Sequence, residues 1–202
     1  MLRILAISAM AILAVPAAAD QDQLSQKDRE TAVQYLQETR TKFLSSIDGL
    51  SDAQWTFKAG PDRWSIAEVS EHIGLSEALI WKILKGQVLT SPKAAADPAR
   101  PSDAKVVEII TDRSHKFQAP EVLKPTARWS TREALVKDFE TERARTIDYV
   151  KTTSDDLRGH VFPHPALKEI DGYQWVLLLA AHSARHTAQI EEVKASADYP
   201  KK

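Results

Sequence analysis

Helix-start signals recur along this chain and constrain its fold more than any other feature. Ser65, Ser130 and Asp171 each stand three residues before a Glu or Gln, and each is followed by an apolar run at helical spacing. In such a capping box the first side chain accepts a hydrogen bond from a backbone N–H of the first turn, and the Glu or Gln reaches back. No segment alternates apolar and polar residues as a half-buried strand does. The pattern predicts an all-α protein.

Apolar residues at three- and four-residue spacing set the extent of each predicted helix. Gly49 and Gly86 follow two of these runs, as glycines do where helices end. We predict long helices over residues 24–47, 65–85, 130–153 and 171–197, and a short helix over residues 103–117. Residues 87–102 and 155–170 lack periodicity, so we expect irregular connections there, the first of them long enough to cover a site. Four long amphipathic helices that bury their apolar faces together form a bundle.

The first 19 residues are predicted to be a secretory signal peptide rather than part of the fold. Arg3 precedes an apolar stretch over residues 4–15, and small residues follow up to Ala19. The stretch is too short to span a bilayer, although an uncleaved anchor remains the alternative. We therefore expect cleavage after Ala19, one domain over residues 20–202, and a periplasmic or secreted protein. No later apolar stretch predicts stable membrane insertion after cleavage.

Composition excludes several classes of function. The formal net charge is -1, so the chain lacks the basic excess typical of nucleic-acid binding. It contains no cysteine, which excludes disulfides, zinc–thiolate sites and a protein thiol nucleophile. A metal ion could be held only by histidine, carboxylate or water.

Two histidines in the last predicted helix have the spacing of metal ligands. His182 and His186 are separated by four residues, so both imidazoles project from one face of a helix, one turn apart. His72 lies among apolar residues of another predicted helix. A buried histidine that faces such a pair across a bundle would supply the third ligand, with a fourth position open to water. The alternative is that all three are hydrogen-bonded core histidines.

The residues beside these histidines exclude one common enzyme class. The zinc-protease motif requires Glu directly after its first histidine, whereas Ser183 occupies that position here. Glu68 could orient His72, but its place in a capping box already accounts for it. Gln189 could contact His186 from one turn away. His115, His160 and His164 are assigned no metal role; loop structure is the expectation for the last, with the mouth of the bundle as the alternative.

Two groups of residues together resemble the DinB-like superfamily. They are Trp55, Pro61, Trp64-Ser65-Ile66, Glu68 and His72, followed by Gln174-Trp175, His182, His186 and Gln189-Ile190. The resemblance extends over residues 23–197. It implies an up-and-down four-helix bundle of the DinB/YfiT-like type with one extra short helix, and a divalent metal bound by His72, His182 and His186. Zinc or nickel is the first expectation, and iron or manganese is also compatible.

The resemblance implies several functions without selecting one. Similar proteins include thiol S-transferases that depend on a metal, a mycothiol-dependent maleylpyruvate isomerase and proteins described as hydrolases, and a homodimer is compatible with the group. A metal held by three neutral imidazoles would activate water or a thiol and polarise a substrate oxygen. We therefore expect a metal-dependent hydrolase or thiol transferase that acts on an unknown small molecule. The alternative is a non-catalytic metal-binding or stress-related module, which the absence of a carboxylate beside the histidine pair favours.

Overall fold

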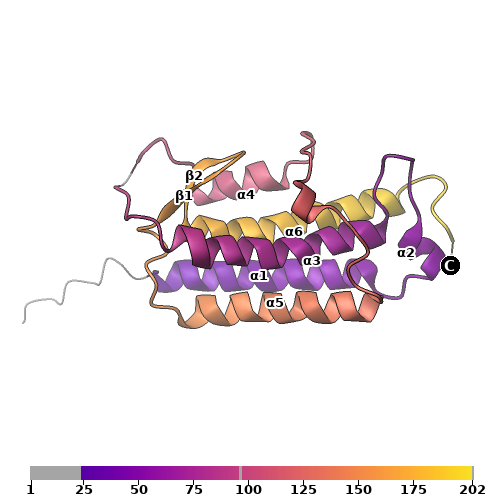
Figure 1. Ribbon diagram of the computed structural model, residues 1–202, viewed down its shortest axis with the longest axis horizontal. Helices are drawn as coiled ribbons and strands as arrows, with labels where there is room; N and C mark the ends of the chain where they lie inside the picture. The colour runs from indigo at the N-terminus through magenta and orange to yellow at the C-terminus, as the bar shows by residue number, and fades with distance from the viewer. Residues whose placement is uncertain (1–23, 96, 202) are drawn as a thin grey trace, which may run out of the picture.

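A computed structural model describes residues 24–95 and 97–201 as a bundle of helices (Figure 1). The predicted signal peptide lies outside the described residues. The helices are α1 (Gln26–Ile47), α2 (Asp52–Thr56), α3 (Ile66–Ile83), α4 (Asp103–Thr111), α5 (Arg132–Thr152) and α6 (Gly172–Lys194). A π-helical turn, η1 (Leu84–Val88), extends α3, and a 3-10 turn, η2 (Glu121–Leu123), precedes α5. The prediction of an all-α four-helix bundle is confirmed, and two short helices, α2 and α4, accompany the four long ones where one was expected.

The four long helices are not arranged around the bundle in chain order. α1 packs against α5 and α6, and α3 packs against the same two helices, so the order around the bundle is α1, α5, α3, α6. α1 and α6 run one way, and α3 and α5 run the other (Figure 1). The long connection that contains α4 crosses back along the molecule to make α3 and α5 parallel. As a result α3 and α6, which carry the three histidines of interest, are antiparallel neighbours.

Four residues, Ser51, Ser65, Ser130 and Asp171, stand three positions before a Glu or Gln at the start of a helix, and a capping box forms at three of them. Complete capping boxes join Ser51 with Gln54, Ser65 with Glu68, and Asp171 with Gln174. The predicted box at Ser130 is wrong, because Thr131 caps α5 by accepting from the backbone N–H of Ala134 at 3.1 Å. Shifting the cap by one residue removes the spacing to Glu133 that a box needs.

Two of the predicted boundaries differ from the structure, at the ends of α3 and α4. The helical path from α3 does not stop at Gly86 but continues to Val88 as a π-helical turn. The short helix ends at Thr111 instead of Phe117, and the side chain of Phe117 is exposed. Beyond Thr111 no buried apolar face remains to hold a helix against the bundle.

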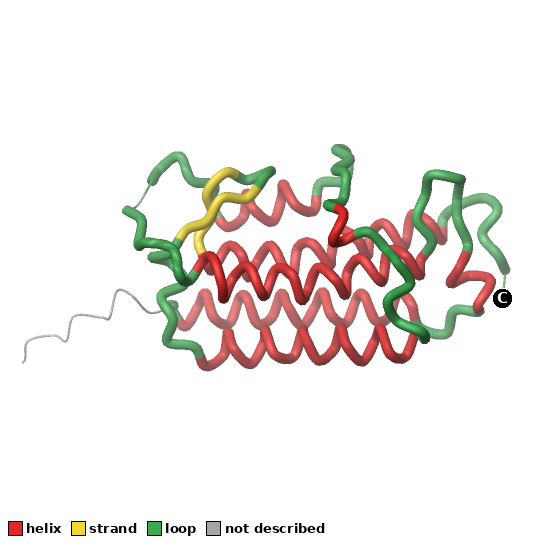
Figure 2. The backbone as a smooth tube through the Cα atoms, in the orientation of Figure 1, coloured by secondary structure: helices red, strands yellow, loops and turns green. Residues whose placement is uncertain are grey.

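The predicted loop at residues 155–170 contains a β-hairpin (Figure 2). Its strands are β1 (Val161–His164) and β2 (Lys168–Asp171), which pair antiparallel from Val161–Asp171 to His164–Lys168. The 87–102 connection contacts the base of this hairpin through a bridge between Lys93 and His160. The expectation that this connection covers the histidines is therefore wrong, since its backbone pairs with the hairpin. Another segment contacts His72.

A fully buried arginine joins the four long helices. Arg143 of α5 donates to both carboxylate oxygens of Glu77 on α3, at 2.9 and 2.5 Å. It also donates to the Leu36 carbonyl and the Thr39 hydroxyl on α1, at 2.8 and 2.7 Å, and to the Ser183 hydroxyl on α6 at 2.8 Å. Around this polar centre the core is apolar, with Phe43 and Phe139 in edge-to-face contact at 4.6 Å among its buried rings.

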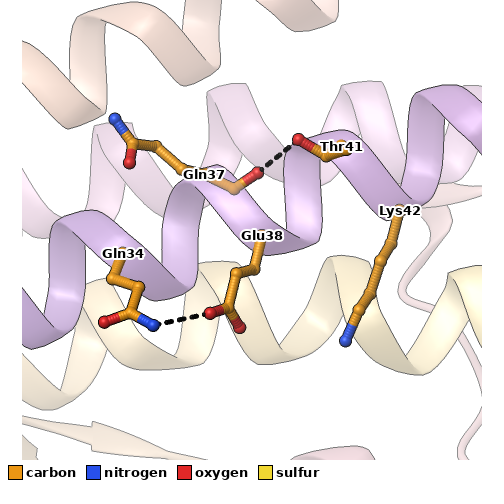
Figure 3. Close-up of a pocket in the computed structure, with 5 residues that line it drawn as sticks. All are labelled: Gln34, Gln37, Glu38, Thr41 and Lys42. Atoms are coloured by element: carbon orange, nitrogen blue, oxygen red, sulfur yellow. Dashed lines mark hydrogen bonds between the residues drawn. The ribbon is translucent and has the colours of Figure 1, made fainter.

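The outer surface of α1 carries a shallow depression that is remote from the histidines. Its walls come from this one helix, where Gln34 donates to Glu38 at 2.8 Å and the Thr41 hydroxyl donates to the Gln37 carbonyl at 3.0 Å (Figure 3). These are ordinary contacts within an exposed helix face, so the depression indicates no site. Within the described residues, no helix combines the length and the apolar character needed to cross a bilayer.

Candidate metal centre

Three imidazoles converge between α3 and α6. The Nε2 atom of His72 lies 3.3 Å from Nε2 of His182 and 3.2 Å from Nε2 of His186. One nitrogen from each ring lies within 4.8 Å of the other two, and this is the single such cluster of potential ligands among the described residues. His72 is buried, whereas His182 and His186 are partly exposed. We call these residues the three-histidine cluster.

Hydrogen bonds at the far side of two rings determine which nitrogens carry lone pairs. Nδ1 of His72 lies 2.8 Å from the Leu123 carbonyl oxygen, which can only accept, so Nδ1 carries the hydrogen. Nδ1 of His186 lies 2.8 Å from Oε1 of Gln189, an atom that also accepts from Arg113 at 3.4 Å. In the neutral rings, the Nε2 atoms of His72 and His186 therefore point lone pairs toward each other.

Electrostatics keep the cluster neutral. Burial lowers the pKa of His72 below its usual value. Burial, and then the charge that His72 would carry, lower the pKa of His186 to about 3. Burial, followed by repulsion from the charges that His186 and His72 would carry, holds the pKa of His182 well below its usual range. Neutral imidazoles with converging lone pairs are the donor set that a divalent cation requires, so these residues fit a metal ion.

Carboxylates near the cluster are engaged elsewhere. Glu68 completes the capping box at the start of α3 by accepting from the Ser65 N–H at 2.7 Å, and it also pairs with Lys58. Its expected structural role is thus confirmed. Glu71, directly before His72, accepts the backbone N–H groups of residues 126–128. Neither carboxylate is among the grouped ligand atoms of the cluster.

The segment between α4 and α5, residues 112–131, lies over the cluster and is here called the α4–α5 segment. It supplies the Leu123 carbonyl to His72. Arg185, between His182 and His186 on α6, holds the start of this segment by donating to the carbonyls of Asp112 and, at 2.6 Å, His115. Side chains next to the histidines in sequence thus fasten the segment that contacts them.

The sequence anticipated the histidines and Gln189 but not their backbone partners. His72, His182 and His186 come together as expected, and Gln189 contacts His186. His115 is exposed beside Asp112, and His160 contacts the Ser91 carbonyl, away from the cluster. The Leu123 carbonyl, which orients His72, was missed. A backbone carbonyl carries no residue-type signal, so no sequence pattern would have revealed it.

His164 is the fourth histidine of interest, and its environment is different. It lies in β1 with its ring centre 5.5 Å from that of Trp175 on α6, so it is not a plain loop residue as expected. Burial lowers its pKa to about 4. Its Nδ1 accepts from the backbone N–H of Ala166 at 3.3 Å, which leaves the hydrogen of the neutral ring on Nε2. His164 is not among the grouped ligands.

Comparison with known proteins agrees with this architecture. The chain is 26% identical over 157 residues to an uncharacterized protein, YuaE, of Bacillus subtilis (strain 168), a match that covers 78% of this chain and 93% of YuaE. The structure of this chain resembles that of YfiT from Bacillus subtilis, which is described as a probable metal-dependent hydrolase with an unusual four-helix bundle topology. The TM-score is 0.59 at 18% identity, covering 88% of this chain and 91% of YfiT, which shows a shared fold. The model of the DinB superfamily matches residues 18–190, so the chain belongs to the DinB superfamily.

Proposed function

We propose that this protein binds a divalent metal ion through His72, His182 and His186 and uses it to hydrolyse a small-molecule substrate. The observation that carries the proposal is the convergence of three neutral imidazoles: Nε2 of His72 lies 3.3 Å from that of His182 and 3.2 Å from that of His186, and the lone pairs of His72 and His186 face each other. Without a cation or a proton between them, such lone pairs repel. The description of YfiT as a probable metal-dependent hydrolase supports the same reaction class.

The protein's own residues would bind and orient the ion. The Leu123 carbonyl and the Gln189 side chain fix the ring orientations of His72 and His186 by accepting from Nδ1. When bound, a divalent ion with three neutral ligands keeps its full charge and supplies Lewis-acid activation of water and of a substrate oxygen. Zinc or nickel suits an all-imidazole donor set best, and iron or manganese is the alternative.

Metal analysis of untagged protein tests the metal site. We expect one divalent ion per chain, and we expect His182→Ala to abolish stoichiometric binding. His115→Ala serves as the matched control, because His115 is an exposed histidine outside the cluster. Wild-type protein that neither retains nor takes up a divalent ion would refute the proposed site.

A substrate screen tests the reaction. Metal-loaded protein should turn over at least one ester, amide or thiol-conjugate substrate, and both chelation and His182→Ala should remove that turnover. The second candidate is a non-catalytic metal-binding module, which is favoured by the engagement of Glu68 and Glu71 in structural contacts. Stoichiometric metal without turnover across the screen would select it, and conversion of thiol conjugates alone would select thiol transfer.

We also propose that residues 1–19 direct export and that the mature protein acts in the periplasm or outside the cell. The apolar stretch that ends in Pro16-Ala17-Ala18-Ala19 supports this. Expression with a C-terminal tag in a Gram-negative host should yield periplasmic protein whose first residue is Asp20. Full-length protein in the cytoplasm would contradict export.

Light scattering of the mature protein would test the homodimer that the family resemblance suggests.

A further inference from the structure

Glu71 is a buried carboxylate with an unusual set of partners. Its side chain is on α3 beside His72, and only 6% of the residue is exposed. One oxygen accepts from the N–H groups of Thr126 and Arg128 at 2.8 and 3.0 Å, and the other accepts from that of Ala127 at 3.0 Å. No arginine or lysine pairs with it in the described part of the chain. Three consecutive backbone donors therefore stabilise the buried charge.

The backbone that surrounds this carboxylate is held in a conformation that it would not adopt freely. Ala127 has a φ of 58°, in the left-handed region that disfavours residues with a Cβ. Successive N–H groups turned to one side form a concave site for an anion. A strained residue persists where its surroundings fix it, and here Glu71 provides the fixing contacts. The carboxylate thus holds residues 126–128 in place.

Those residues are closely linked to the group that orients His72. Leu123, whose carbonyl accepts from Nδ1 of His72 at 2.8 Å, is three residues before Thr126. The 3-10 turn η2 fixes Leu123, since its N–H donates to the Pro120 carbonyl at 2.9 Å, and Pro125 stiffens the short link that follows. The position of the Leu123 carbonyl therefore depends on the anchored residues 126–128.

We propose that Glu71 is a positioning residue for the three-histidine cluster: by anchoring residues 126–128, it fixes the Leu123 carbonyl that orients the His72 ring and keeps Nε2 free of hydrogen. The inference rests on the proposed function, because it concerns the metal affinity of that cluster. Glu71 itself contacts no metal ligand through its side chain. It acts through the backbone of the α4–α5 segment.

The test compares two buried glutamates on the same helix. In Glu71→Gln an amide NH2 replaces one acceptor oxygen and confronts at least one backbone N–H, so the anchor is weakened. We expect the zinc affinity, measured by competition with a chromophoric chelator, to fall by about ten- to a hundredfold. Glu71→Asp, which keeps the charge but is shorter, should fall between Glu71→Gln and the wild type.

Glu77→Gln is the matched control. Glu77 is also buried, but its partners are Arg143 and Ser183 in the bundle centre, and it makes no hydrogen bond with the described residues of the α4–α5 segment. We expect this variant to lose stability while the zinc affinity of the folded protein stays within about twofold of the wild-type value. Equal losses of affinity in the two glutamine variants would show that affinity merely follows stability, and would overturn the proposal.

A measurement without metal separates this inference from the proposed function. Nitrogen NMR of the histidine rings in metal-free protein should show hydrogen on Nδ1 of His72 in the wild type and in Glu77→Gln, and a mixture of tautomers in Glu71→Gln. A wild-type tautomer in Glu71→Gln would overturn the positioning role, whatever the metal result. Failure of the wild type to bind zinc, nickel, iron or manganese would instead refute the proposed function, while the tautomer data would still decide the role of Glu71.

Discussion

The buried arginine at the centre of the bundle provides a quantitative test of how the four helices are held together. In Arg143→Met the aliphatic stem is retained and the guanidinium is removed. The Glu77 carboxylate, 2% exposed, then loses the two bonds at 2.9 and 2.5 Å that compensate its charge and keeps one from Ser183 at 2.9 Å. Removing one partner of a buried ion pair costs about 3–5 kcal/mol in the free energy of unfolding.

Removing the second charge should reverse most of this loss. In the double variant Arg143→Met with Glu77→Leu, no buried charge remains and the space is filled by apolar atoms. Replacement of a whole buried pair by apolar residues is often nearly neutral. We therefore expect the double variant to be more stable than Arg143→Met alone, with a coupling free energy of at least about 2 kcal/mol.

Urea unfolding of metal-free protein, followed by far-UV circular dichroism, measures these differences without a contribution from metal binding. Thr41→Ala, on the exposed face of α1, is a control that should change stability by less than about 0.5 kcal/mol. If the double variant lost as much stability as the two single variants together, Arg143 and Glu77 would be energetically independent. The assignment of the network as one charge-compensated unit would then be refuted.

Three further predictions concern the core, the hairpin and the start of α6. Phe139→Ala removes a fully buried ring 4.6 Å from that of Phe43 and should lower the free energy of unfolding by about 3–5 kcal/mol in urea titrations, whereas an unchanged midpoint would contradict the packing. Because burial lowers the pKa of His164 to about 4, the unfolded chain takes up this proton first, so His164 should contribute a fall in stability of at most about 3 kcal/mol as pH decreases from about 6.5 to 4, in addition to the contribution of the three-histidine cluster. His164→Gln should flatten that part of the pH profile, and a profile identical to the wild type would exclude His164 as its source. Gly172→Ala places a Cβ 2.9 Å from the Leu157 carbonyl oxygen and should cost about 1–3 kcal/mol, while Gly86→Ala, where a Cβ meets nothing within 4 Å, is the control.

Local chemistry explains which parts of the fold were predictable. The caps at Ser65 and Asp171 and the apolar spacing that follows them are properties of neighbouring residues, so they locate α3 and α6 within a few positions. The one-turn spacing of His182 and His186 is equally local. These signals were sufficient to predict an all-α bundle and the residues of the three-histidine cluster.

Features that depend on distant contacts were not predictable in the same way. The strands of the hairpin are four residues each, and β1 has no buried residue, so no alternating pattern marks it. The order of the helices around the bundle follows from how the long connection that contains α4 crosses back along the molecule, and helical periodicity does not encode that path. The roles of Glu71 and the Leu123 carbonyl depend on backbone atoms that meet across more than fifty residues.

The arrangement of the helices also determines how late folding can finish. α6 packs against α1, α3 and α4, yet it follows all three of them in the chain. Until it packs in place, the apolar faces of three earlier helices lack their common partner, and His72 lacks both of the imidazoles that it meets 110 and 114 residues later. Completion of the core is therefore a late, long-range event, which makes folding slow relative to bundles in which neighbouring helices pair in chain order. The chain remains incompletely folded until α6 is available, so chains truncated before α6 should be readily degraded.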